Sequence, residues 1–270
     1  MSFDLAGYLE RIGASAGSDL RALHRAHVAA IPFENLDPHQ GIPVSLEPED
    51  LERKLVADRR GGYCFEQNLL FKAALEAAGW RVEPMLARVR YGAPPGAVRP
   101  RTHLLLRVSA DGVSWHADVG FGNGTPVEPL QFGPAGVHEM DGWSFRVVEE
   151  GDELVLQTLE EPGWQAVYAF APRPVPLVDV ETSNWFTSTY PRSPFVTGLI
   201  ASVQRRDGTR IALSDWSGEL TLTERTPQSS VVTPVTRDAA PELLEQHFGL
   251  NGFRVDADGR LRSIRADAHT

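Results

Sequence analysis

The 270-residue chain is poor in cysteine and in basic charge, and it contains no long apolar run. Its single cysteine excludes an internal disulfide and a cysteine-rich zinc site, and it favours a reducing compartment. With 26 Lys and Arg against 36 Asp and Glu, the net charge of −10 argues against a nucleic-acid partner. No stretch approaches the roughly 18 apolar residues of a membrane-spanning helix, and the N-terminal segment MSFDLAGYLERIG resembles no signal peptide. We therefore expect a cytoplasmic protein without a membrane span.

The composition that remains is ordinary for a globular protein, with 42% hydrophobic and 23% charged residues. Residues 1–80 show apolar side chains at helical spacing. The pattern predicts helices over 3–13, 18–31, 47–58 and 64–79. Residues 31–46, which prolines interrupt, are expected to form a loop or short turns. Residues 81–180 contain short β-rich runs between turn signals, typical of an antiparallel sheet or small barrel. Residues 181–270 mix both kinds of run, so we expect three parts.

The lone cysteine lies in the segment RRGGYCFEQN, residues 59–68. Gly61 and Gly62 permit a tight turn and the close approach of another molecule. The following run, CFEQNLLFKAALEAAG, predicts a helix that ends at Gly79 and begins beside Cys64. The N-terminus of a helix favours negative charge, and therefore a thiolate nucleophile. The alternative is a buried cysteine that acts as a small hydrophobic residue.

A cysteine nucleophile needs a base and a group that orients the base. The segment THLLLRVSADGVSWHADVG predicts a hairpin whose two-residue turn is Asp111-Gly112, so that opposite residues sum to 223. In that register His103 and Asp118 are diagonal neighbours on one face, within reach of each other. A slip of one residue would separate them.

His116 shares this face but lies further along the hairpin, so it is the second candidate base. Its alternative reading is a histidine that covers the sheet. Other histidines, such as His24 and His27 on a helix expected at the surface, are read as exposed or ordinarily packed.

A second glycine-rich segment, GFGNGT, follows Asp118. Alternating glycines can bring backbone N–H groups to a phosphate or an oxyanion. The segment lacks the lysine of a phosphate-binding Walker loop, and a plain barrel turn is the alternative reading.

Taken together, the segments RRGGYCFEQN, TH in a strand and DVGFGNG resemble the arylamine N-acetyltransferases. IPFENLDPHQGIPV (31–44), FDLAGYLERIG near the start and NWFTSTYPRSPFVTGL (184–199) resemble further segments of this family. The resemblance runs from about residue 3 to at least residue 200. One departure is Tyr190, where many relatives have histidine, and it bears on substrate preference rather than on chemistry.

The resemblance implies an α+β fold with an N-terminal helical domain (1–80), a central antiparallel β-barrel (81–180) and a C-terminal mixed α/β lid (181–270). It also implies a Cys–His–Asp arrangement like that of cysteine proteases and transglutaminases. Cys64 becomes the acyl-accepting nucleophile, His103 the base and Asp118 the residue that holds the base.

The family's ligands are implied in the same way: acetyl-CoA as acyl donor, a small aromatic amine or hydrazine as acceptor, and no permanently bound cofactor or metal. The implied donor contacts are Gly120, Gly122, Asn123, Gly124 and Thr125, and the implied aromatic pocket is Phe33, Phe121 and Phe195. The oligomeric state is left open. Alternatives with the same triad are an amide synthase that closes a macrolactam and a cysteine hydrolase or transglutaminase-like enzyme; a binding module without catalysis is a third.

Two charged residues in the family-like segments FEN and RGGYC bracket the nucleophile loop. We expect Glu34 and Arg60 to form a partly buried ion pair there. The alternative is two solvated surface charges.

Overall fold

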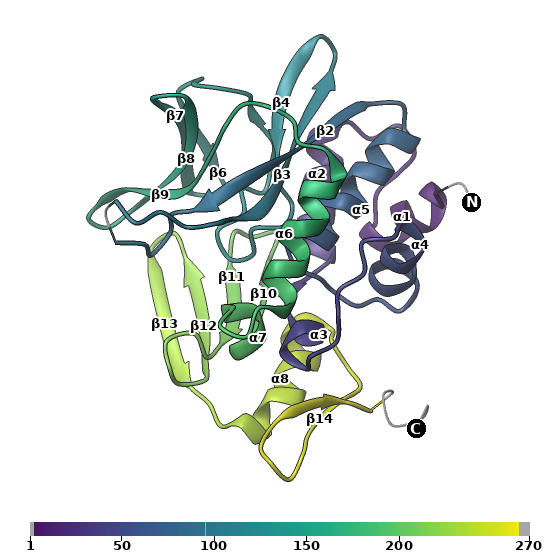
Figure 1. Cartoon of the computed structure of the whole chain (residues 1–270), viewed down its shortest axis with the longest axis vertical. Helices are drawn as coiled ribbons and strands as arrows, with labels where there is room; N and C mark the ends of the chain where they lie inside the picture. Colours follow the sequence, from purple (N-terminus) through teal and green to yellow (C-terminus); the bar gives the residue numbers. More distant parts are fainter. Residues whose placement is uncertain (1–2, 95, 265–270) are drawn as a thin grey trace.

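The N-terminal part of the chain is mainly helical, as the periodicity predicted (Figure 1). The structure, a computed structural model, describes residues 3–94 and 96–264. The elements of this part are α1 (Leu5–Ile12), α2 (Leu20–Ala30), β1 (Phe33–Glu34), α3 (Leu36–His39), α4 (Pro48–Leu51), the π-helical turn η1 (Glu52–Ala57) and α5 (Cys64–Ala77). Residues 31–46, expected to form a loop or short turns, contain the short helical turn α3 and also the two-residue strand β1, which was not expected. Gly79, with φ of 93°, follows the end of α5 and confirms the predicted stop.

The middle of the chain is a curved antiparallel sheet that forms a nearly closed barrel (Figure 1). Its strands are β2 (Arg81–Val89), β3 (Arg101–Ala110), β4 (Val113–Ala117), β5 (Leu130–Gln131), β6 (Val137–Met140), β7 (Trp143–Glu150), β8 (Glu153–Glu160) and β9 (Gly163–Phe170). They pair in the order β5-β4-β3-β2-β9-β8-β7-β6. The barrel is therefore built mostly from hairpins between neighbours in sequence.

The hairpin of β3 and β4 has the predicted register. Leu106 pairs with Ala117 and Ala110 pairs with Val113, so each pair sums to 223. The turn residues Asp111 and Gly112 have φ of 51° and 76°, as a two-residue turn of this type requires. β4 ends at Ala117, and the chain leaves the sheet immediately before Asp118.

The C-terminal part combines a second sheet with helices. Its elements are α6 (Leu177–Thr189), α7 (Pro194–Thr197), β10 (Ile200–Gln204), β11 (Arg210–Ser214), β12 (Thr221–Thr226), β13 (Ser229–Pro234), the 3₁₀ turn η2 (Arg237–Ala239), α8 (Ala240–Phe248), β14 (Phe253–Val255) and β15 (Leu261–Ser263). The sheet order is β1-β10-β11-β12-β13, so a strand of the N-terminal part forms one edge of this sheet. The boundaries expected near residues 80 and 180 stay predictions, and α6 runs across the second of them.

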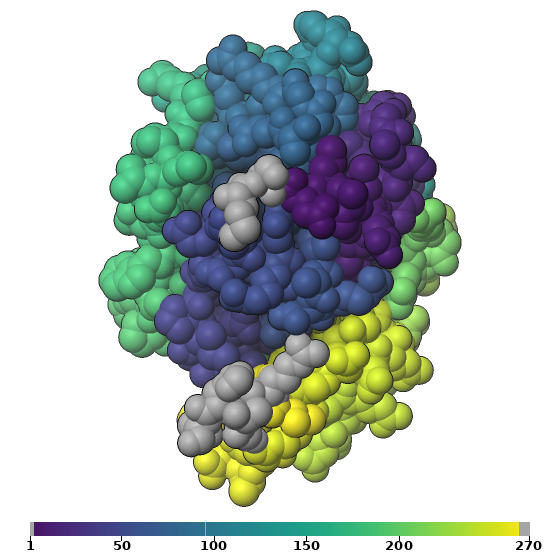
Figure 2. Space-filling view, turned by 90° about the vertical axis from the view of Figure 1, so that its right-hand side faces the viewer, coloured from purple at the N-terminus to yellow at the C-terminus, as the bar shows by residue number. Residues whose placement is uncertain are grey.

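The three parts pack closely, and the N-terminal residues lie between the barrel and the C-terminal residues on the face shown in Figure 2. One buried cluster joins α1, α2 and α5 to the barrel, and another lies beneath α8. A third, smaller cluster surrounds Cys64 with side chains that include Phe33, Tyr63, Leu104 and Val180. Cys64 therefore lies where all three parts meet. Over residues 3–94 and 96–264, the helices are too short or too polar to cross a membrane.

Candidate active site

Cys64 is the first residue of α5, as expected, and its side chain is buried. The two glycines before it serve close approach within the chain itself. A Cβ at Gly61 would lie 2.2 Å from the Pro32 carbonyl oxygen, and one at Gly62 would lie 2.8 Å from a carboxylate oxygen of Glu66. The expectation that the glycines admit another molecule is therefore not needed to explain them.

His103 on β3 and Asp118 just after β4 are brought together as the hairpin predicted. His103 Nε2 lies 2.8 Å from Asp118 Oδ2, and both side chains are almost fully buried. Cys64 Sγ lies 3.7 Å from the carbonyl oxygen of Thr102, the residue before His103. The hairpin and the start of α5 thus place a thiol, an imidazole and a carboxylate in one small volume.

The carboxylate of Asp118 is surrounded by hydrogen-bond donors. Oδ2 accepts from His103 Nε2 and from the Tyr168 hydroxyl, both at 2.8 Å. Oδ1 accepts from Asn68 Nδ2 at 3.0 Å and from the Gly120 N–H at 2.9 Å. Four donors hold a single buried anion, so its position and its charge are both strongly determined.

Charge and hydrogen bonding overcome burial at the His103–Asp118 pair. Burial alone would lower the pKa of His103, but the charge and hydrogen bond of Asp118, with a smaller contribution from Cys64, raise it to about 10. Burial alone would raise the pKa of Asp118, but the His103 charge and the hydrogen bonds hold it well below its usual range. At neutral pH the pair is therefore an imidazolium and a carboxylate.

His116 is one hydrogen bond further from the carboxylate. Its Nε2 lies 2.7 Å from the Tyr168 hydroxyl, which gives its own proton to Asp118. His116 Nε2 must then be the donor, because that hydroxyl has one proton. Burial lowers the pKa of His116 to about 4, so this histidine is neutral and supports the tyrosine.

α2 has an exposed face with Arg21 and Ala22, but His24 and His27 lie on its buried face. His24 Nε2 accepts the backbone N–H of Asp118 at 3.2 Å, and burial lowers the pKa of His24 to about 4. His27 lies between the Tyr8 hydroxyl and the amide oxygen of Gln67. Both are therefore packed histidines: His27 contacts α1 and α5, and His24 contacts the segment that follows β4.

A cavity of about 1020 Å³ opens beside these residues. Cys64 and His103 lie in its wall. So do the three expected pocket residues, Phe33, Phe121 and Phe195. The Phe121 ring meets the His103 ring edge-on at 5.1 Å, and the Phe33 and Phe195 rings are 6.3 Å apart. The cavity therefore presents flat apolar surfaces close to the thiol.

Tyr190, the departure from the family pattern, also lines this cavity. Its ring stacks on Phe186 with centroids 4.8 Å apart, and its hydroxyl accepts a hydrogen bond from Arg192 Nε at 2.8 Å. Phe186 and Arg192 line the same cavity. A histidine at this position would change the size and polarity of the wall.

Only some of the residues expected to contact the donor line the cavity. Gly120, Asn123 and Gly124 line the cavity, whereas Gly122 and Thr125 lie behind the lining. Gln204 of β10 donates to the carbonyl oxygens of Gly122, at 3.3 Å, and Thr125, at 2.7 Å. The glycine-rich turn is thereby tied to the C-terminal sheet.

Close packing requires glycine at position 120. A Cβ at this position would lie 2.8 Å from Cys64 Cα, so a larger residue would displace the start of α5. The turn thus packs directly against the backbone of the cysteine.

Sequence reasoning missed Asn68 and Tyr168, two of the donors to Asp118. Asn68 was detectable, because it lies four residues after Cys64 and therefore on the same face of α5. Tyr168 gave no signal, because β9 meets Asp118 only once the barrel has closed.

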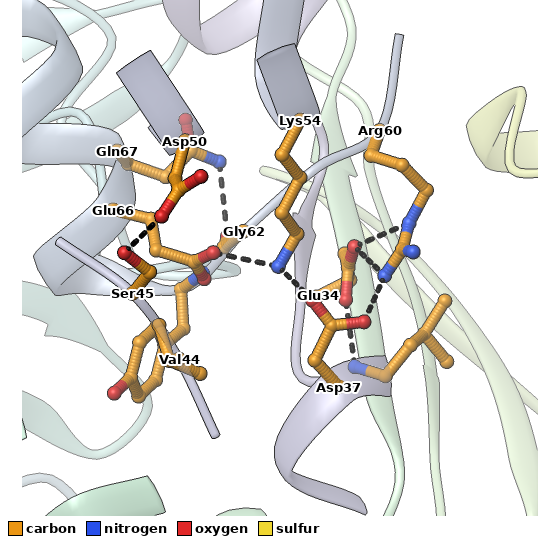
Figure 3. A network of polar contacts seen from close by, with 12 residues as sticks. Glu34, Asp37, Val44, Ser45, Asp50, Lys54, Arg60, Gly62, Glu66 and Gln67 are labelled. Carbon is orange, nitrogen blue, oxygen red and sulfur yellow. Dashed lines mark hydrogen bonds and ion pairs between the residues drawn. The ribbon is translucent and has the colours of Figure 1, made fainter. Parts of the chain in front are cut away.

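The expected ion pair between Glu34 and Arg60 is confirmed. Arg60 Nη2 and Nε lie 2.7 and 3.0 Å from Glu34 Oε1, and the Glu34 side chain is fully buried (Figure 3). Arg60 Nη2 also contacts Asp37 Oδ1 at 2.9 Å, and Lys54 Nζ joins Asp37 to Glu66 at 2.6 Å on each side. A network of ion pairs therefore reaches the start of α5 through Glu66, which accepts the backbone N–H of Tyr63.

Comparisons with known proteins place the chain in a family. A family model described as N-acetyltransferase matches residues 18–255. The arylamine N-acetyltransferase of Mycobacterium tuberculosis (strain ATCC 25618 / H37Rv) is 36% identical over 272 residues, covering 97% of this chain and 95% of the relative. That of Escherichia coli (strain K12) is 38% identical, with 88% and 85% covered. The Mycobacterium marinum arylamine N-acetyltransferase solved in complex with CoA superposes with a TM-score of 0.87 at 39% identity, covering 92% and 93% of the two chains.

The fold, the large cavity with a cysteine in its wall and these matches over nearly the whole chain define a transferase of acyl groups. More narrowly, the chain belongs to the arylamine N-acetyltransferase family.

Proposed function

We propose that the chain transfers an acetyl group from acetyl-CoA to an arylamine, arylhydrazine or N-hydroxyarylamine by a two-step, ping-pong route through acetyl-Cys64. The observation that carries the proposal is the 2.8 Å contact of His103 with Asp118 beside Cys64, in the wall of a cavity large enough for both substrates in turn. The relative solved with CoA supports acetyl-CoA as the donor.

In the first step the Cys64 thiolate attacks the thioester carbonyl of acetyl-CoA. The new S–C bond forms, the bond to the CoA sulfur breaks, and the leaving thiolate takes a proton from the His103 imidazolium. His103 donates from Nε2 to Asp118, so Nδ1 is the nitrogen that serves Cys64. Asp118 acts through His103, by holding the ring and stabilising its charge. Backbone N–H groups at the start of α5 stabilise the oxyanion.

In the second step an amine attacks the acetyl-cysteine. Neutral His103 accepts the proton that the amine loses, and Cys64 leaves as the thiolate. Phe33, Phe121 and Phe195 hold the flat ring of the acceptor. Gly120, Asn123 and Gly124 contact the donor, while Gly122 and Thr125 shape the turn. We place the reaction in the cytoplasm, where a lone reactive thiol stays reduced.

An intact-mass measurement after addition of acetyl-CoA without an amine tests the proposal. We expect the mass to rise by one acetyl group, and Cys64→Ser to abolish the rise. Addition of aniline should then return the free enzyme and release acetanilide. A folded wild type that stays unmodified refutes the proposal, and an acetylated form that water clears as fast as aniline does indicates a hydrolase.

A further inference from the structure

Glu66 follows Cys64 by two residues on α5, and both of its carboxylate oxygens are engaged (Figure 3). Oε2 accepts the backbone N–H of Tyr63 at 3.0 Å, and Oε1 accepts the ammonium group of Lys54 at 2.6 Å. The Glu66 side chain is 2% exposed. Its carboxylate also packs against Gly62, where a Cβ would lie 2.8 Å from Oε2.

The contact with Tyr63 bears directly on Cys64. The first N–H groups of a helix have no partner within the helix, and a glutamate at the third position can reach back to satisfy one of them. Here that N–H belongs to Tyr63, the residue before Cys64. The carboxylate therefore holds the backbone from which the cysteine side chain projects. Because both oxygens accept hydrogen bonds, protonation would break one of the two contacts.

The charges around Glu66 favour its protonated form. The charged groups that face it are Lys54 on η1, Asp37 on α3, Glu34 on β1 and, beyond these two acids, Arg60 on the segment before α5. With Glu66 itself, three carboxylates share two cations, which leaves one negative charge in excess.

The excess negative charge raises the pKa of both partners of the Lys54–Glu66 pair. Burial alone would lower the pKa of Lys54, but three nearby acids hold it well above its usual range. Burial and the two other acids outweigh Lys54 at Glu66 and raise the pKa of Glu66 to about 7. The carboxylate that caps α5 is thus only marginally ionised at neutral pH, and Lys54 is its one direct cationic partner among the described residues.

We propose that Lys54 is a positioning residue for the reaction of Cys64. Its charge favours the ionised form of Glu66, and ionised Glu66 holds the Tyr63 backbone and the start of α5 in the reactive arrangement. This rests on the proposed function only in taking Cys64 as the nucleophile. Lys54 contacts Glu66 and Asp37 and is not among the residues that line the cavity.

The test is the pH profile of two reactions of Cys64, alkylation by iodoacetamide and acetylation by acetyl-CoA, in wild type and Lys54→Met. Wild type should show an acid limb centred near pH 7, where Glu66 takes up its proton. In Lys54→Met the limb should move up by about one pH unit or more, because the nearest positive charge is gone. The rate at pH 7 should then fall about fivefold or more and recover at about pH 9.

Three further variants test whether Lys54 acts on Cys64 through Glu66. Lys54→Arg should restore the position of the limb, because it restores the charge. Glu66→Gln should remove this limb, and adding Lys54→Met to Glu66→Gln should change the profile little, because Lys54 acts through Glu66. Lys72→Met is the matched control: Lys72 pairs with Glu76 on the same helix, at 2.7 Å, but far from its N-terminus. Its profile should match wild type.

A rate that falls equally at every pH in Lys54→Met would assign Lys54 a merely structural role and overturn the proposal. So would an unmoved acid limb in a folded Lys54→Met protein. Alkylation needs no acetyl-CoA, so a wild type that is alkylated but never acetylated would refute the proposed function while leaving this proposal testable.

Discussion

Two buried carboxylates, Asp118 and Glu66, lie near the start of α5, and their surroundings shift their pKa values in opposite directions. Asp118 faces one cation and three neutral donors, and its pKa is held well below the usual range. Glu66 faces one cation, one backbone N–H and two further acids, and its pKa is raised to about 7. Both side chains are almost fully buried. Burial therefore does not decide the charge of an acid; the number of donors and of like charges around it does.

Because their pKa values shift in opposite directions, the two acids make opposite contributions to the pH dependence of stability. The lowered pKa of Asp118 stabilises the fold above the unfolded value, and that stability is lost as the pH falls through the folded value. The raised pKa of Glu66 stabilises the fold below the unfolded value, and that stability is lost as the pH rises towards about 7. Asp118 is therefore ionised at every working pH, whereas Glu66 titrates near neutral pH.

The largest effect is expected for Asp118→Asn, which removes the charge of the first of these two acids. Asparagine keeps the shape but loses the charge, and its amide can select the wrong tautomer of His103. The matching change in a serine triad lowers turnover about 10⁴-fold, and we expect roughly 10³-fold here because a thiolate depends less on its base. Single-turnover acetylation measures the loss, and circular dichroism checks the fold.

His116→Gln is the control for that experiment. A glutamine amide can still donate to the Tyr168 hydroxyl, so most of the activity should remain. An active Asp118→Asn together with an inactive His116→Gln would refute the assignment of His103 as the base and of Asp118 as the residue that orients it.

The ion-pair network around Glu66 is tested most directly at Arg60. Arg60→Met leaves Glu34 and Asp37 without their shared cation and deepens the excess negative charge, so it should cost about 3–5 kcal/mol of unfolding free energy. Glu34→Gln should also lower the melting temperature, but by less, because it relieves that excess. Urea unfolding of both variants measures the order, and equal or reversed costs would contradict the charge count.

The pH dependence of stability sharpens the contrast further. In wild type the titration of Glu66 should remove on the order of 1–3 kcal/mol of stability as the pH rises from its unfolded pKa to about 7. Glu66→Gln cannot titrate and should lack this decline. Urea unfolding at several pH values measures the difference between the two proteins. Parallel curves would show that Glu66 stays ionised throughout.

The smallest expected effect is that of Tyr168→Phe, which removes one of the four donors to Asp118. The remaining three keep the carboxylate charged and in place. We expect a loss of about 1 kcal/mol, or roughly fivefold in acyl transfer. A loss as large as that of Asp118→Asn would mean that Tyr168 takes part in the chemistry itself.

The hairpin shows how far local sequence can predict a site. A two-residue turn sets the pairing of the residues on either side, so the meeting of His103 with Asp118 followed from the turn alone. The start of α5 at Cys64 followed equally from local signals. These predictions held because each depends on residues close together in the chain.

The burial of His24 and the edge strand β1 were not predictable in this way. The apolar stripe of α2 indicated one packed face, but the carbonyl of Val127 and the backbone of Asp118 that receive His24 lie about a hundred residues away. β1 has two residues, and it is a strand only because β10 lies beside it. Long-range partners decide such features.

The sequence by itself determined the helix that begins at the cysteine, the hairpin that joins histidine to carboxylate, and the family. The tertiary structure decided what surrounds each acid. Asp118 gains Tyr168 from another strand and Asn68 from α5, whereas Glu66 gains two acids and a lysine from β1, α3 and η1. A buried charge is set by the groups within a few ångströms of it, and folding brings those groups together from distant parts of the chain.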